Sequence, residues 1–470
     1  MTSPYTGYAI SFLLGSLVLK TILRGQRLPA ALFLFLAVAT GLGWSAFLGF
    51  FSLLLCDGFH PAGLLAAHGL CIGALGLWNV RSGWETARKF RVRLPARLPL
   101  PMDWLYASCL IFLFALSSGI TYAFAIPNCF GDWDGWAVWN TKMKFILTAG
   151  SQWENVFRLH WHTQPEYPLL LPLVNAWGWI FFPKNFYTVP VNTGILVTLC
   201  SIGLMHAGLT GRVSRWSALL AAAVLALFPQ FTILGVSQYA DVVLAFYLLA
   251  AVTVLLKALT ARDEQFFLLA GLLIGFLTFT KNEGIIMAAL LVGISGIHIG
   301  RSSGISRKLK IRMGLCLAGG CLLTSLPTIV LKTVLAPPNR DILVWGHSLT
   351  GTFFNWEGIV LVWRALFKIL TATYYSYIFL ALGLLFVLQA PRYFKKENAV
   401  LTVFLLCYTG ILLLVYLTTI NFDLEWRLSR TLGRQMLILL PVSLFLYFYA
   451  CWPAVQDPEP NTPSADNHKD

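Results

Sequence analysis

The sequence predicts an all-α protein, a polytopic bundle of transmembrane helices. Hydrophobic residues make up 57% of the 470-residue chain and charged residues only 11%, whereas soluble domains carry about 25% charged residues. Apolar runs of about 20 residues, the length that spans the hydrocarbon of a bilayer, recur along the whole chain. Because helices satisfy their own backbone hydrogen bonds, such a chain is expected to cross the membrane as a helical bundle.

About 13 apolar runs are expected to span the membrane. They lie near residues 6–23, 30–54, 62–79, 103–125, 187–208, 216–234, 240–258, 264–280, 283–299, 312–335, 367–389, 398–420 and 433–452. A further apolar run, from Pro168 to Pro183, is short and bounded by proline, so we interpret it as a partial helix on the outer side. The polar, proline-rich stretch 453–470 is expected to be a disordered cytoplasmic tail.

Basic clusters near alternate spans set the orientation. Because cytoplasmic loops are rich in Lys and Arg, these clusters place the N-terminus outside and the C-terminus inside. The net charge of +14 is therefore attributed to loops at the membrane, and no nucleic-acid partner is expected. The other polar residues then gather on the outer side, which predicts one polar site open to the extracytoplasmic space. The basic clusters lie near residues 20–27, 81–97, 212–215, 257–262, 301–312 and 392–396.

The stretch GDWDGWAVWNTKMKFI follows the fourth predicted span. Trp136, Trp139 and Met143 have helical spacing, which predicts an amphipathic helix along the membrane interface in the first large outer loop. Such a helix would hold Asp132 and Asp134 at the boundary between water and lipid. A carboxylate there could act as a general base or hold a divalent cation. The alternative is an interfacial anchor with two solvated aspartates.

The stretch HWHTQPEYPLLLP contains His160, His162, Glu166 and Tyr167. The two histidines could ligate a metal ion with Glu166 as a third ligand. Alternatively, Glu166 could cap the partial helix that follows, since a carboxylate suits a helix N-terminus.

Two further stretches place charged residues at the outer mouths of spans. In SQYADVVLAFY, Asp241 begins a long apolar run and could be either a site residue or a helix cap. In TFTKNEGIIM, Lys281 lies in a short polar turn between two spans, where it could bind a lipid phosphate or pair with Glu283.

Three arginines, Arg427, Arg430 and Arg434, share one face of the helix that begins in EWRLSRTLGRQMLILLP. Their outer position departs from the usual cytoplasmic bias of basic residues. Because guanidinium groups bind phosphate in a bidentate manner, this departure suits a site that holds an anionic lipid head.

The ordered set WDGWAVWNTKMKF, EYPLLLP, YADVVLAFY, TKNEG and RTLGRQMLILLP resembles the GT-C superfamily of integral-membrane glycosyltransferases. It looks most like bacterial relatives of the protein O-mannosyltransferases and the lipid A aminoarabinose transferases. The resemblance predicts an N-terminal transmembrane addition at 1–101 and a catalytic module at 102–452. It implies a polyprenyl-phosphate sugar donor, an extracytoplasmic acceptor (a glycan, lipid or protein hydroxyl) and a place in the bacterial inner membrane.

The resemblance also implies roles for residues. Asp134 would be the general base, with Asp132 as the alternative, and Glu166 would be a second catalytic acid. Lys281 and the arginines near Arg434 would bind the phosphate, and a divalent metal cofactor is left open. The expected substrate-binding residues are Trp136, Lys142, His162, Tyr167, Tyr239, Asp241, Lys281, Glu283, Arg430 and Arg434.

Two rival functions would use similar residues. A transporter or flippase of a lipid-linked or small polar substrate is the first, but transporters usually place polar residues near the midplane within repeated halves. An oligosaccharide polymerase or ligase is the second, and it would differ mainly in moving a whole glycan. The gathering of polar residues on one side disfavours the transporter, and release of polyprenyl phosphate with transfer of one sugar would favour the glycosyltransferase.

Overall fold

The computed structural model describes residues 3–81, 92–93, 101–184, 186–338, 356–375, 377–417 and 423–452. Within these ranges, ten helices are long and apolar enough to cross a membrane, or eleven if one bent pair counts as a single span. The chain is an integral membrane protein, and the predicted transmembrane bundle is confirmed, whereas the count of 13 spans is not. The tail predicted at 453–470 lies outside the described residues.

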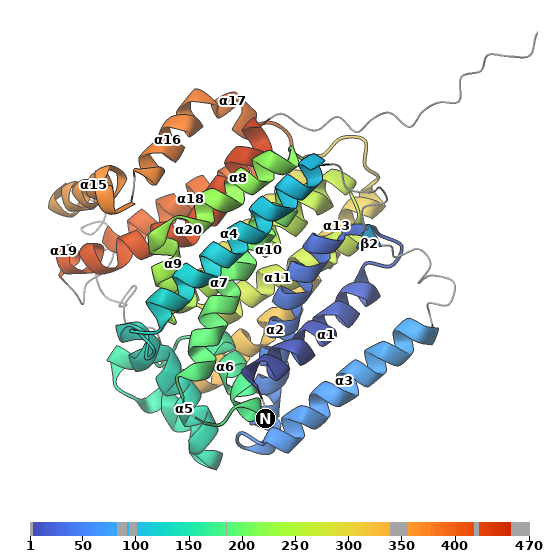
Figure 1. The fold of residues 1–470 in the computed structure, drawn as a ribbon, viewed down its shortest axis with the longest axis vertical. Helices are drawn as coiled ribbons and strands as arrows, with labels where there is room; N and C mark the ends of the chain where they lie inside the picture. The colour runs from blue at the N-terminus through green and yellow to red at the C-terminus, as the bar shows by residue number, and fades with distance from the viewer. Residues whose placement is uncertain are drawn as a thin grey trace, which may run out of the picture.

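The span-length helices run through the whole described chain (Figure 1). They are α1 (Pro4–Ile22), α2 (Ala30–Cys56), α3 (Pro61–Arg81), α4 (Pro101–Ala125), α7 (Thr188–Leu209), α10 (Ala240–Ala261), α12 (Asn282–Arg301), α13 (Arg307–Val330) with η4 (Leu331–Leu335), α18 (Asn398–Leu417), and α20 (Gly433–Cys451) preceded by α19 (Leu424–Arg427) and η6 (Leu428–Leu432). Two short strands, β1 (Leu28–Pro29) and β2 (Val92–Arg93), pair in parallel.

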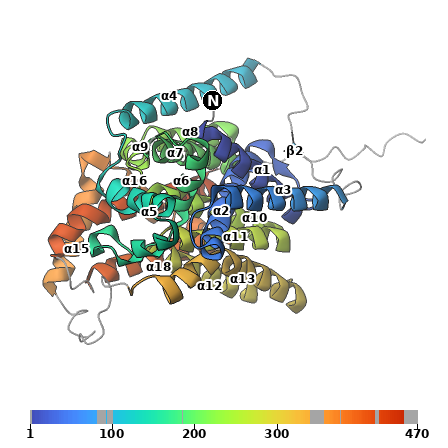
Figure 2. The same cartoon turned by 90° about the horizontal axis from the view of Figure 1, so that it is seen from below.

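Helix α10 forms the centre of the bundle. Every residue from Ala240 to Leu256 is buried, as expected for a helix that is apolar on all sides. It packs against α7, α20 and the shorter helix α11 (Glu264–Thr280). In Figure 2, α4 lies along one outer face of the bundle, and α12 and α13 lie along the opposite face. Asp241, in the first turn of α10, is accordingly fully buried.

The first two helices pack directly on the rest of the bundle. Helices α1 and α2 both contact α6 (Leu170–Phe181), and α2 also contacts α7. The indole Nε1 of Trp177 on α6 donates hydrogen bonds to Gly7 O at 2.9 Å and to Ser11 Oγ at 3.1 Å. Helix α6 is the partial helix expected at 168–183, and its length of 12 residues is too short to cross the membrane.

Two predicted spans are broken. The prediction of one span at 367–389 is wrong, because the chain forms α15 (Trp356–Thr371), a short η5 turn (Thr373–Tyr375) and α16 (Ile378–Leu388). Tyr377 adopts a left-handed φ of 54°, which interrupts the helix. The predicted span 216–234 bends by 60° between α8 (Arg215–Ala226) and α9 (Pro229–Val236), because Pro229 disfavours a helical residue before it.

Candidate functional site

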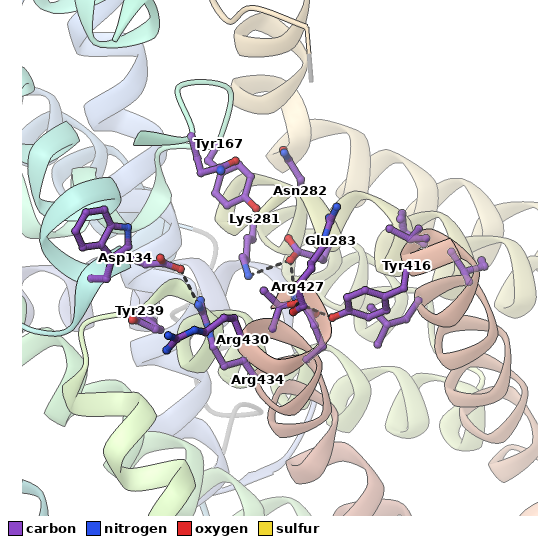
Figure 3. A pocket seen from close by; sticks show the side chains of 18 of the residues that line it. Asp134, Tyr167, Tyr239, Lys281, Asn282, Glu283, Tyr416, Arg427, Arg430 and Arg434 are labelled. Carbon is purple, nitrogen blue, oxygen red and sulfur yellow. Dashed lines mark hydrogen bonds and ion pairs between the residues drawn. The ribbon is translucent and has the colours of Figure 1, made fainter. Parts of the chain in front are cut away.

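One cavity of about 720 Å³ brings together segments that are far apart in the sequence (Figure 3). Its wall includes the loop before η1 (Gly135–Asn140), the N-terminus of α10, the turn between α11 and α12, and the segment of α19 and η6. Most of the predicted site residues therefore meet at one place. The predicted residues that line the cavity are Asp134, His162, Tyr167, Tyr239, Lys281, Glu283, Arg430 and Arg434.

Arg434 joins two carboxylates at the base of this cavity. Its Nη1 lies 2.7 Å from Asp134 Oδ2, and its Nη2 lies 2.8 Å from Asp241 Oδ2. The guanidinium also lies over the ring of Tyr239, 4.2 Å from the ring centroid. The Asp241 side chain is fully buried and caps no helix, because Tyr239 is the N-cap of α10. Arg434 thus holds Asp134 in a fixed orientation toward the cavity.

Lys281 completes this charged network. Its Nζ lies 3.1 Å from Asp241 Oδ1 and 2.9 Å from Glu283 Oε1. Burial alone would lower the pKa of Lys281, but the two carboxylates outweigh it and raise the pKa above its ordinary value. The ammonium is therefore charged and already paired. Arg430, by contrast, is exposed on the cavity wall and forms no ion pair among the described residues.

Glycine allows the first loop to wrap closely around the start of α10. A Cβ atom on Gly131 would lie 2.7 Å from Ser237 O, and one on Gly135 would lie 2.5 Å from the same atom. Gly131 also has a positive φ of 74°, which favours glycine. Between them, Asp132 accepts a hydrogen bond from Ser237 Oγ at 2.5 Å. Asp132 is thereby held outside the cavity wall, while Asp134 lines the cavity.

Gln238 forms hydrogen bonds with both ends of the same loop. Its Nε2 donates to Cys129 O at 2.9 Å, and its Oε1 accepts from Asn140 Nδ2 at 2.6 Å. Its φ of 61° is left-handed. No sequence pattern pointed to Ser237 or Gln238, because their roles depend on contacts across more than 95 residues of chain.

Substitution of Gly135 by alanine is expected to displace the loop that carries Asp134. The added Cβ would meet a backbone oxygen 2.5 Å away, and overpacking of this kind typically costs about 1–3 kcal/mol. We expect a lower melting temperature together with a loss of activity in the purified protein. Gly293→Ala, on helix α12, is the matched control for stability, since nothing lies within 4 Å of its added Cβ and its φ is not left-handed. A Gly135→Ala protein as stable as Gly293→Ala would contradict the close approach.

Trp136, Trp139 and Met143 have the helical spacing that predicted an amphipathic helix, but they do not share one face. Trp139 and Met143 are buried, whereas Trp136 is 47% exposed and packs edge-on against Trp133 with ring centroids 4.7 Å apart. The reason is that residues 135–140 form a π-helix, whose wider turn shifts the phase of the following side chains. Trp133, and not Trp136, lines the cavity.

Two lysines fasten the loop that contains Glu166. Lys142 donates a hydrogen bond to Gln164 O, and Lys332 Nζ donates to Glu166 O at 2.7 Å. Lys142 is fully buried and Glu166 nearly so, and both lie behind the cavity wall that Gln164 helps to form. Leu169, and not Glu166, is the N-cap residue of α6.

Burial lowers the pKa of Lys142 from 10.5 to about 7, and although Glu166 opposes this shift, Lys332 reinforces it. Between these two pH values the unfolded chain binds this proton and the folded protein does not. The contribution of Lys142 to the free energy of unfolding therefore increases as the pH rises from about 7 to 10.5. We expect the melting temperature of the wild type, relative to Lys142→Met, to rise between pH 7 and pH 9. A difference that does not change with pH would contradict the shift.

The two histidines of the predicted metal site stack on each other. Their ring centroids are 4.6 Å apart, and the Nδ1 atoms of His160 and His162 are 2.8 Å apart. Among the described residues, no group of three or more His, Cys, Asp or Glu side chains is arranged to hold a metal ion. The set of His160, His162 and Glu166 therefore does not fit a three-ligand site.

Part of the chain is similar to a known protein family. Residues 184–329 match a family model described as Dolichyl-phosphate-mannose-protein mannosyltransferase. The match covers less than half of the chain but includes Tyr239, Asp241, Lys281 and Glu283. It confirms the predicted resemblance to GT-C enzymes over these residues. With the apolar helices, it supports a membrane glycosyltransferase.

The chain is also similar to a protein of known structure. The crystal structure of the oligosaccharyltransferase of Archaeoglobus fulgidus in the apo form is 13% identical, with a TM-score of 0.33. The alignment covers 75% of this chain and 58% of that chain, so the chain spans little more than half of that protein. No curated protein matches the chain.

Proposed function

We propose that the chain transfers a sugar from a polyprenyl-phosphate donor to a hydroxyl of an extracytoplasmic acceptor, in the bacterial inner membrane. The observation that supports this most is the junction of Asp134 and Arg434 in one cavity that Lys281 and Arg430 also line. A carboxylate that can take a proton thus lies beside cations that suit a phosphate leaving group.

The donor would be held by its phosphate and its lipid chain. Arg434 and Lys281 are already paired with carboxylates, so we assign the main phosphate contact to Arg430. Apolar side chains of α12 and α18 continue the same cavity wall, and they suit a polyprenyl chain. These apolar residues are Ile286, Ile411, Leu412 and Val415.

In the proposed reaction, the acceptor oxygen attacks the anomeric carbon while Asp134 accepts the hydroxyl proton. The bond between the anomeric carbon and the phosphate oxygen breaks, and polyprenyl phosphate leaves with the electron pair. Positive charge develops on the sugar, as in other glycosyl transfer. Arg430 would stabilise the negative charge on the departing phosphate. Asp241 and Lys281 would act through Arg434, which orients Asp134.

A donor panel tests this proposal. Purified full-length protein would be given polyprenyl-phosphate sugars and an acceptor extract, with and without a chelator, and both transferred sugar and released polyprenyl phosphate would be measured. The proposal predicts equal amounts of the two products for at least one donor. Uptake of substrate into sealed proteoliposomes without release of polyprenyl phosphate would instead identify a transporter.

Substitution of Arg430 by glutamine tests the phosphate contact. We expect the KM for the donor to rise about 10-fold or more, because a charge-assisted hydrogen bond contributes about 1.5–3 kcal/mol. Arg364→Gln is the matched control, since Arg364 is exposed on α15 and does not line the cavity. Equal KM values for the two variants would remove Arg430 from the phosphate site.

A further inference from the structure

Three polar side chains on one part of the cavity wall keep hydrogen-bonding atoms that the protein does not use. They are Asn282 and Glu283 at the start of α12 and Gln435 near the start of α20. Both amide atoms of Asn282, Oε2 of Glu283 and Oε1 of Gln435 are buried and have no partner in the described part of the chain. Buried polar atoms are normally hydrogen-bonded, so this cluster calls for an explanation.

The orientation of the Glu283 and Gln435 atoms is fixed by the other contacts of these two side chains. Gln435 is 7% exposed, and its Nε2 donates to Glu283 Oε1 at 2.7 Å. This bond turns the amide oxygen of Gln435 away from the carboxylate. Glu283 Oε1 also forms an ion pair with Lys281 Nζ at 2.9 Å, so Oε2 is the oxygen without a partner. Figure 3 shows Lys281, Asn282 and Glu283 one after another at the cavity.

The chemistry of the unused atoms indicates the class of ligand. The amide oxygens of Asn282 and Gln435 and Oε2 of Glu283 are acceptors, whereas the amide nitrogen of Asn282 is a donor. A phosphate offers only acceptors and would meet the carboxylate of Glu283. Lys281 already pairs with that carboxylate, and the amide side chains of Asn282 and Gln435 beside it are neutral. Neutral hydroxyl groups, which both donate and accept, complement this set.

We propose that Asn282, Glu283 and Gln435 form a subsite that binds ring hydroxyls of the transferred sugar and so selects the sugar. This inference rests on the proposed function, because it places the sugar of the lipid donor next to the apolar wall of α12 and α18. Tyr408 and Tyr416 line the same part of the cavity, and aromatic rings of this kind pack against sugar faces.

A binding experiment tests the subsite without requiring catalysis. The Kd of the purified full-length protein would be measured for a polyprenyl-phosphate sugar and for polyprenyl phosphate alone. We expect the sugar to tighten binding about 10-fold or more, as two or more hydrogen bonds would allow. Asn282→Ala and Gln435→Met are each expected to reduce this preference about 5-fold or more without changing the Kd for polyprenyl phosphate.

Asn282→Ala is the sharper variant, because the Asn282 side chain makes no hydrogen bond within the described residues and its removal should leave the fold intact. Asn192→Ala is the matched control, since Asn192 lies on α7 outside the cavity and should keep the full preference. If Asn282→Ala weakened the binding of both lipids by the same factor, or left both Kd values unchanged, the subsite would be overturned. If neither lipid bound to the wild type, the subsite and the proposed function would both be overturned.

The transfer assay separates the two proposals. If the wild type prefers the sugar-bearing lipid and the variants lose this preference, but no sugar is transferred, the proposed function fails and the subsite stands. If sugar is transferred and the variants discriminate between donors as the wild type does, the subsite fails and the function stands. Donors that each lack one ring hydroxyl would then identify the contact. For the donor that lacks the hydroxyl bound by Asn282, the Asn282→Ala protein and the wild type should have the same Kd.

Discussion

Asp134→Asn is expected to lower kcat by about 10²- to 10⁴-fold, the usual contribution of a general base. Asparagine has nearly the same shape and can still accept a hydrogen bond from Arg434, which lies 2.7 Å from the carboxylate in the wild type. It cannot take a proton from the acceptor hydroxyl. We therefore expect donor binding to change little, so the loss should appear in single-turnover transfer by protein saturated with donor.

Asp132→Asn is the paired variant, because Asp132 is the other carboxylate of the same loop. Its side chain is bound to Ser237 and lies outside the cavity wall, so we expect a much smaller loss of kcat. If Asp134→Asn transferred sugar at the wild-type rate, Asp134 would not be the base. If Asp132→Asn lost more activity than Asp134→Asn, the alternative assignment would be correct.

Arg434→Met is expected to lower the free energy of unfolding by on the order of 3 kcal/mol, because it leaves the buried Asp241 with Lys281 as its remaining partner. Methionine retains much of the length of the side chain but removes both ion pairs. Activity should fall as well, since Asp134 loses the group that orients it. Thermal unfolding in detergent would measure the change in stability.

A second substitution separates charge from packing in this result. The double variant Arg434→Met, Asp241→Asn also removes the Asp241 carboxylate, which the single variant leaves without its guanidinium partner. Part of the lost stability should therefore return. Activity should not return, because Asp134 remains without Arg434. If Arg434→Met alone were as stable as the wild type, the buried Asp241 carboxylate would not need Arg434 for its stabilisation.

Composition and apolar runs were enough to predict the membrane bundle, since the hydrocarbon of the bilayer fixes the length and the polarity of every span. They failed where local backbone geometry decides the structure. The π-helix at 135–140 turned Trp136 away from its predicted partners. The left-handed Tyr377 broke a run that reads as one span, and no hydropathy pattern signals either feature.

The gathering of polar segments was predictable because membrane topology brings alternate loops to the same side. Asp134, Lys281 and Arg434 were expected at one site, and they line one cavity. The finer division of roles was not predictable. Lys142 and Asp241 lie behind the wall and fasten other residues, because which side of a loop faces a cavity depends on tertiary contacts.

The proposed function requires this cavity to hold a lipid phosphate beside Asp134. The most direct measurement is an experimental structure of the purified protein with polyprenyl phosphate bound. We expect density for the phosphate next to Arg430 and within reach of Asp134, with the lipid chain along Ile286 and Leu412 between α12 and α18. Lipid density at another face of the bundle, with this cavity occupied only by water, would contradict it.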